Sequence, residues 1–317
     1  MPRLALTTIS AALAILTATS AHAEYPEKNI EFIIPFGTGG GFDRAVRLIS
    51  PYLEQTLPNK VEVIPKNVPG AGGRKGTAQV YRAKPDGYTI GIANVPGIAL
   101  PGLTGEKIEY DIDKFTWVAR LGVAEYIAGV SAKSSIKSID DLRKLGRPVK
   151  FTATGFGATA YAAGQILAKE MNFPVQMLGG YKGSAEYVLA VARGDGDITV
   201  APVIVMKKFI QAGEIRGLFT TEENSSAPGV PTIASLGYKN LTGLGVDRYV
   251  LASPALPAPI VKALSDAMLK AADNPELVAK AAKTGEPFAP LGHDKAKAAA
   301  DQSLALYLKY KAEISKR

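Results

Sequence analysis

The sequence predicts a two-lobed α/β protein whose lobes face each other across a ligand cleft. Short apolar, β-branched runs alternate with amphipathic stretches, as expected for parallel sheets covered by helices. A chain of 317 residues is long enough for two compact lobes. Four glycine-rich turns each stand between a strand and a helix, at residues 37–41, 70–73, 155–157 and 179–183. Because such turns lie at the carboxyl ends of parallel strands, two facing lobes would bring them to one cleft.

Residues 1–23 have the features of an export signal. Arg3 supplies positive charge, residues 4–18 are apolar or small, and Ala21-His22-Ala23 fits a small-x-small cleavage site. The apolar run is short and interrupted by threonine and serine, which suits a signal peptide better than a membrane span. We therefore expect a periplasmic protein, exported with a cleavable signal and mature from about Glu24.

The composition argues against several kinds of chemistry. The chain has no cysteine, which excludes disulfides, thiol catalysis and cysteine-bound metal. His22 would leave with the signal, and a single remaining histidine, His293, argues against a catalytic triad or a multi-histidine zinc site. The net charge of +8 is spread along the chain among acids, which indicates attraction for small anions rather than nucleic acid. We expect no metal, no cofactor and no nucleic-acid partner.

The first lobe is predicted from residues 24–124 together with residues 248–317. A buried strand at 30–35 leads through the first glycine turn into an amphipathic helix, which Pro51 is expected to kink or to end near Ser50. The other elements expected in this lobe are a strand at 61–65, a helix at 77–83, a strand at 89–93 that ends at Asn94, and helices near 259–272 and 294–314.

The second lobe is predicted from residues 125–247. Residues 115–130 contain two extended apolar segments, of which the second is expected to carry the chain across. Ser138, with acids at 140 and 141, predicts a helix start. The other elements expected here are strands at 149–153, 175–178, 198–201 and 215–220, and helices from the turn at 154–159 to about 171 and from the turn at 179–184 through 193. Residues 249–252 are expected to return the chain to the first lobe.

Two nucleotide-binding motifs are approximated but incomplete. Gly76 separates Lys75 from Thr77, which a Walker A motif does not allow. Gly155-x-Gly157-x-x-Ala160 matches a dinucleotide fingerprint, but residues 175–180 lack the acid that such a site needs. Nucleotide hydrolysis and a dinucleotide cofactor are therefore disfavoured.

The first glycine turn is a candidate anion site, with an ordinary tight strand-to-helix connection as the alternative. Helix N-termini carry free amides and partial positive charge, so turns from both lobes could bind one anion without a buried counter-ion. Asp43 has three open roles, as a general acid or base, as a carboxylate that caps the helix, or as a group that receives a ligand amine or a bridging water. Capping is the default among these roles.

Several motifs follow one another over essentially the whole mature chain. They are Gly39-Gly40-Gly41-Phe42-Asp43, Asn67-Val68-Pro69-Gly70-Ala71-Gly72-Gly73, Lys84-Pro85-Asp86-Gly87-Tyr88-Thr89, Tyr181-Lys182-Gly183, and Pro228-Gly229-Val230-Pro231-Thr232 before Leu236-Gly237-Tyr238. Together they resemble the Bug-type solute receptors of tripartite tricarboxylate transporters. The resemblance implies a periplasmic binding protein of type II-like architecture, with two α/β lobes that close on a small carboxylate.

The resemblance also implies a set of ligand-binding residues and no catalytic or metal residue. In such receptors main-chain amides and ordered water at the first loop hold one carboxylate, and the opposite lobe contributes further turns. The residues that match are Phe36, Gly37, Thr38, Gly39, Gly40, Gly41, Asp43, Asn94, Thr154, Gly155, Gly157, Thr159, Tyr181, Ala201 and Pro202. The family's usual proline pair is Gly37-Thr38 here and its usual Gly-Thr-Asp is Gly41-Phe42-Asp43, which leaves the exact ligand open.

The predicted function is capture of a small di- or tricarboxylate for uptake by a tripartite tricarboxylate transporter. The protein would act as a monomer with membrane permease subunits as partners, and not as an enzyme. Two alternatives stay open: an exported enzyme acting on an anionic small molecule with Asp43 as base, and a sensory subunit that presents its ligand. The enzyme is disfavoured because the sequence shows no second poised group.

Overall fold

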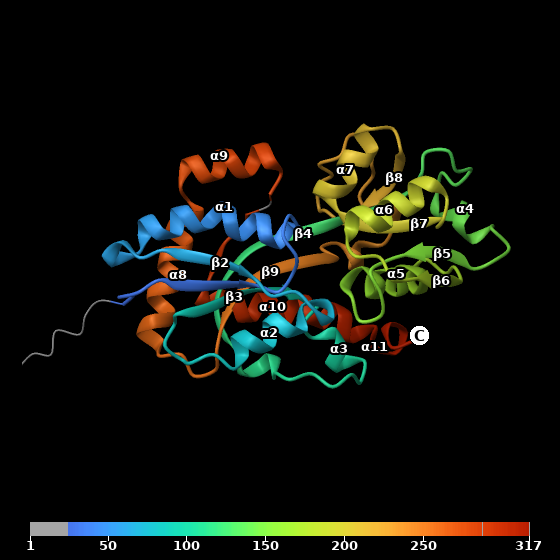
Figure 1. Cartoon of the computed structure of the whole chain (residues 1–317). Helices are drawn as coiled ribbons and strands as arrows, with labels where there is room; N and C mark the ends of the chain where they lie inside the picture. Colours follow the sequence, from blue (N-terminus) through green and yellow to red (C-terminus); the bar gives the residue numbers. More distant parts are fainter. Residues whose placement is uncertain (1–24, 287, 317) are drawn as a thin grey trace, which may run out of the picture.

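The computed structural model describes residues 25–286 and 288–316, which form two lobes side by side (Figure 1). One lobe carries α1, α2, α8 and α9, the other carries α4 to α7, and β4 and β9 run between them. The predicted export signal at residues 1–23, like Glu24, lies outside the described residues. Among the residues that are described, no helix combines the length and the apolar character that a membrane span requires.

The sheet of the first lobe is mixed, so the prediction of wholly parallel strands is wrong. β1 (Ile30–Ile34) pairs in parallel with β2 (Val63–Asn67) and with β3 (Thr89–Val95). β9 (Gly245–Ala252) pairs antiparallel with β3. Since β1 and β2 are parallel neighbours, the turns that follow them lie at the same edge of the sheet.

Helices cover both faces of this sheet. One apolar cluster packs α1 (Gly41–Thr56) and α8 (Ala258–Ala272) on one face. A second cluster packs α2 (Arg74–Tyr81) and α10 (His293–Lys309) on the other face. The remaining helical segments of this part of the chain are α3 (Leu100–Leu103), α9 (Pro275–Thr284) and the 3-10 turns Pro58–Lys60, Ala71–Gly73 and Ile112–Lys114.

Of the two predicted effects of Pro51, a kink or an end of the helix near Ser50, the end is wrong, because α1 continues to Thr56. A proline inside a helix costs about 3 kcal/mol. The buried face of α1 extends across the proline with Val46, Ile49 and Leu53, all fully buried. Because each such side chain contributes about 1.5–3 kcal/mol on burial, packing against the sheet outweighs the lost hydrogen bond.

The second lobe combines a parallel and an antiparallel part. β5 (Val149–Thr152) pairs in parallel with β6 (Val175–Leu178) and with β7 (Ile198–Pro202), while β7 and β8 (Ile215–Thr220) pair antiparallel with β4. β6 and β8 have the bounds that the sequence predicts, and Ser138 caps α4 as expected. The helical segments are α4 (Ile139–Arg143), α5 (Thr159–Glu170), α6 (Ser184–Arg193), α7 (Val203–Gln211), α11 (Lys311–Ile314) and the 3-10 turns Ala234–Leu236 and Lys239–Leu241.

β4 (Thr116–Ser131) is one continuous strand that runs from the first lobe into the second, whereas the sequence predicted two extended segments. Its first half pairs with β9 and β10 (Leu291–Gly292), and its second half pairs with β7 and β8. The pairing register shifts at residues 117–119, 120–122 and 128–129. A strand of 16 residues is about 50 Å long, which is enough to serve both sheets.

The C-terminal segment packs on the second lobe. Tyr307, Tyr310 and Ile314 belong to the same buried cluster as α5 and β7. In Figure 1 the C-terminus accordingly lies beside α5. The residue boundaries proposed for the two lobes stay a prediction.

Candidate functional site

The first glycine loop, residues 36–41, connects β1 to α1. Residues 37–40 are exposed, and Gly40 is the N-cap of α1 with no side chain to cap the helix. Gly39 has φ of 75°, a left-handed conformation that glycine adopts without strain. The first amides of α1, together with the positive end of the helix dipole, are therefore available to an anion.

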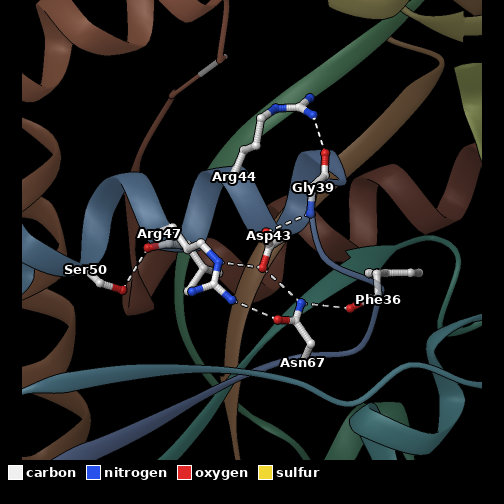
Figure 2. Close-up of polar contacts among 8 residues, drawn as sticks. Phe36, Gly39, Asp43, Arg44, Arg47, Ser50 and Asn67 are labelled. Carbon is white, nitrogen blue, oxygen red and sulfur yellow. Dashed lines mark hydrogen bonds and ion pairs between the residues drawn. The ribbon is translucent and has the colours of Figure 1, made fainter.

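Asp43 is held inside this loop by three donors (Figure 2). Its Oδ2 accepts a hydrogen bond from the Gly39 amide at 2.9 Å, and its Oδ1 accepts from Asn67 Nδ2 and Arg47 Nε, each at 2.9 Å. Burial alone would raise the pKa of Asp43, but these hydrogen bonds and the Arg47 charge hold the pKa below its usual value. With 4% of the residue exposed, the carboxylate is ionised and already partnered.

Asn67 ties the loop to the neighbouring strand. Its Nδ2 also donates to the Phe36 carbonyl at 3.0 Å, and its Oδ1 accepts from Arg47 Nη2 at 2.9 Å. Asn67 is the last residue of β2 and pairs in register with Ile34 of β1. Neither Asn67 nor Arg47 was predicted as a site residue, although the four-residue spacing of Asp43 and Arg47 on a helix is a signal for an ion pair.

The second glycine turn, residues 70–73, and the start of α2 pack against the residues that enter the first loop. A Cβ atom built at Gly76 would lie 2.8 Å from the Cα of Pro35, and one at Gly73 would lie 3.0 Å from the Phe36 ring. Gly73 has φ of 98° and forms the N-cap of α2. The glycines here allow α2 to pack closely against the residues that enter the first loop.

Two turns of the second lobe lie against each other. They are the turn at residues 154–158, which precedes α5, and the turn at residues 179–183, which precedes α6. The Gly180 amide donates to the Thr154 carbonyl at 3.0 Å, and a Cβ at Gly179 would lie 3.1 Å from the Cα of Gly155. Tyr181 is half-buried and packs against the core of this lobe.

A direct polar contact joins the two lobes near these turns. Asn94 Nδ2, at the end of β3, donates to Thr159 Oγ1 at 3.2 Å, and Thr159 is the first residue of α5. Gly157 faces the first lobe, because a Cβ built there would lie 3.6 Å from Glu106 Oε1. The structure thus brings Asn94, Gly157 and Thr159 together at the boundary between the lobes.

Ala201 and Pro202 lie at the end of β7. Ala201 is buried and pairs with Ile127 of β4, and Pro202 pairs with Tyr126. They therefore adjoin the strand that crosses between the lobes. Whether any candidate residue contacts a ligand stays a prediction.

A family model and a sequence relative both match most of this chain. A family model described as "Tripartite tricarboxylate transporter family receptor" matches residues 46–309. Protein BugT of Bordetella pertussis (strain Tohama I) is 28% identical over 249 residues, or 74% of this chain and 75% of BugT.

Two solved structures share the fold. The periplasmic binding protein BugD is similar with a TM-score of 0.77 and 21% identity, covering 92% of this chain and 98% of BugD. MatC from Rhodopseudomonas palustris with bound malate has a TM-score of 0.75 and 20% identity, covering 92% of this chain and 100% of MatC. The predicted two-lobed α/β architecture of periplasmic binding proteins is confirmed, as is the predicted resemblance. The chain belongs to the receptor family of tripartite tricarboxylate transporters.

Proposed function

We propose that this receptor captures a small organic di- or tricarboxylate in the periplasm and delivers it to membrane permease subunits. The N-terminal signal would direct export and would be cleaved off before about Glu24. The mature protein would act as a monomer. The observation that supports this proposal is the first glycine loop, whose exposed residues 37–40 precede the N-terminus of α1, while the nearby carboxylate of Asp43 is already bonded within the lobe. The malate bound to the similar protein MatC supports this class of ligand.

The amides around residues 37–41 would bind one ligand carboxylate, and the exposed Thr38 would add a hydroxyl donor. A carboxylate bound by several amides gains charge-assisted hydrogen bonds, and no side-chain cation has to be desolvated. The turns that begin α5 and α6 carry the same kind of helix N-terminus, which suits a second carboxylate. The proposed site therefore favours a ligand with two or more anionic groups.

Asp43 would act through the loop and not on the ligand. Both of its oxygens accept hydrogen bonds from groups of the first lobe. A general base needs a lone pair directed at its substrate, so this arrangement favours a receptor over an enzyme. The other candidate residues, Asn94 and Thr159 among them, would complete the site when the lobes close.

A thermal-shift screen tests the proposal. The mature protein is heated with malate, succinate, adipate, citrate, aromatic acids and acidic amino acids, each at millimolar concentration. A ligand at 100 times its Kd stabilises by about 2.7 kcal/mol, which raises the Tm of a protein of this size by roughly 4–5 °C. The absence of any shift would overturn the carboxylate assignment. Conversion of a bound acid into a product, followed by NMR, would overturn the receptor assignment in favour of an enzyme.

A further inference from the structure

The carboxylate of Glu286 lies where α1, β9 and the segment after α9 meet. Glu286 is 4% exposed and forms a buried ion pair with Arg248 of β9 through Oε1. Arg44 Nε, in the first turn of α1, lies 3.6 Å from the other carboxylate oxygen. One buried carboxylate is thus shared by two arginines from different elements.

Arg44 connects this carboxylate to the first glycine loop. Its Nη1 donates to the Gly39 carbonyl at 2.7 Å (Figure 2). The Gly39 amide donates to Asp43 on the other side of the same residue. Both polar groups of Gly39 are therefore held, its amide by Asp43 and its carbonyl by Arg44, which restricts the orientation of the neighbouring amides.

Glu286 also offsets positive charge at the start of α1. A Cβ atom built at Gly41 would lie 3.0 Å from Arg248 Nη2 and 3.7 Å from Arg44 Nη2, so both guanidinium groups come close to the helix N-terminus. Cations are unfavourable at this end of a helix. The glycine at position 41 leaves space for them, and the carboxylate of Glu286 partly neutralises them.

The residue before Glu286 contacts the second lobe. A Cβ at Gly285 would lie 3.2 Å from Ile204 Cδ1, so the backbone of Gly285 packs against that side chain. Ile204 lies in the first turn of α7, two residues after the candidate residue Pro202. The turn formed by Gly285 and Glu286 therefore contacts the second lobe through Ile204 and the first glycine loop through Arg44.

We propose that Glu286 is a positioning residue of the ligand site, which holds Arg44 on the Gly39 carbonyl and links the first loop to the position of the second lobe. The proposal rests on the proposed function, because it takes the first loop as the site of a ligand carboxylate.

The substitution Arg44→Ala tests the first half of the proposal and keeps the buried pair of Arg248 and Glu286. We expect the 1H–15N resonances of residues 39–41 to shift in the ligand-free protein and ligand affinity to fall about tenfold, the size of one hydrogen bond to a charged group. Arg44→Lys can still donate to the Gly39 carbonyl and should recover part of the affinity. Unchanged resonances and affinity in R44A would overturn the proposal.

Arg143→Ala is the matched control. Arg143 is the last residue of the short helix α4, donates to a backbone carbonyl, that of Met171, at 2.7 Å, and pairs with Asp140. Its side chain is 37% exposed, close to the 43% of Arg44, but it lies in the second lobe away from the first loop. Loop resonances and affinity should stay as in the wild type, and equal changes in both variants would overturn a specific role for Arg44.

Two further variants test Glu286 and the link between the lobes. Glu286→Gln leaves the buried charge of Arg248 unpaired and is expected to lower stability. In the folded fraction it should move the same loop resonances as R44A.

Ile204→Ala tests the link between the lobes and should also shift the resonance of the Arg44 Nε group. The absence of that shift would overturn the link to the second lobe. If the wild type bound no carboxylate, the proposed function would fail, while the ligand-free spectra would still decide the role of Glu286.

Discussion

Replacement of Asp43 by asparagine tests how far the first loop depends on a carboxylate. Gly39 donates to one oxygen of Asp43, while Asn67 and Arg47 donate to the other, all at 2.9 Å. Asparagine offers one acceptor oxygen and one NH2 group, so either orientation of its amide places an NH2 group against a donor. The substitution keeps the size of the side chain but removes at least one hydrogen bond.

The expected cost follows from the burial of the group. A hydrogen bond to a charged group contributes about 1.5–3 kcal/mol, and a buried donor left unpaired costs about 1–3 kcal/mol. The side chain of Asp43 is 6% exposed, so water replaces little of the lost bonding. We expect D43N to lower the free energy of unfolding in urea by about 2–3 kcal/mol. Calorimetric titration with a ligand from the screen should show affinity at least about tenfold weaker, because the loop loses part of the bonding that holds it in place.

Asp141→Asn is a matched control for this experiment. Asp141 also lies in the first turn of a helix and accepts a hydrogen bond from the amide four residues before it, that of Lys137, at 2.8 Å. Unlike Asp43, the residue is only half-buried and this hydrogen bond is exposed. We expect Asp141→Asn to change the free energy of unfolding by less than about 1 kcal/mol and to leave ligand affinity unaltered. An unfolding midpoint of D43N equal to that of the wild type would refute the anchoring role of Asp43. Normal stability with lost binding would indicate direct contact with the ligand.

Three more variants or conditions probe the fold and the loop. Gly39→Ala places a side chain at φ of 75°, which costs about 1–2 kcal/mol, and should weaken ligand binding without changing the circular dichroism spectrum. Thr221→Val leaves the buried Tyr126 amide without the acceptor it has at 2.8 Å, so the free energy of unfolding should fall by about 2 kcal/mol, and an unchanged urea midpoint would contradict this. Burial alone would raise the pKa of Asp197, but the ion pair with Arg147 lowers this pKa in the folded state. As the pH falls, the unfolded chain therefore binds the proton at a higher pH than the folded protein does. Stability should therefore fall as the pH drops below about 4, and Asp197→Asn should flatten that loss in urea titrations.

The sequence predicted local elements better than their pairing. β6 and β8 are short apolar runs bounded by turn residues, and both have the predicted bounds. Residues 115–130 were predicted to contain two extended segments, yet pairing with strands from both lobes makes β4 one continuous strand. α7 and α9 were not predicted at all, and their helical state depends on packing that one sequence does not display.

The candidate site shows the same limit. The glycine turns and the position of Asp43 at the start of a helix could be predicted from sequence. The contact of Asp43 with Asn67 could not, because it depends on the register that sets Asn67 opposite Ile34. The sharing of Glu286 by two arginines depends in turn on chain segments that meet only in the folded protein.

The continuous strands between the lobes constrain how this receptor can close. Most of β9 pairs with β4, and the second half of β4 also pairs with β7 and β8, so one sheet extends through the boundary. A hinge made of free loops would allow large rotations, whereas paired strands bend mainly where their ladder is irregular. The register of β4 shifts at residues 120–122 and 128–129, on either side of its middle. Closure by bending at these shifts would move the turn at Thr159 relative to Asn94 while the first loop keeps the shape set by Asp43. In that arrangement a rigid loop receives the ligand, and the second lobe supplies the movement.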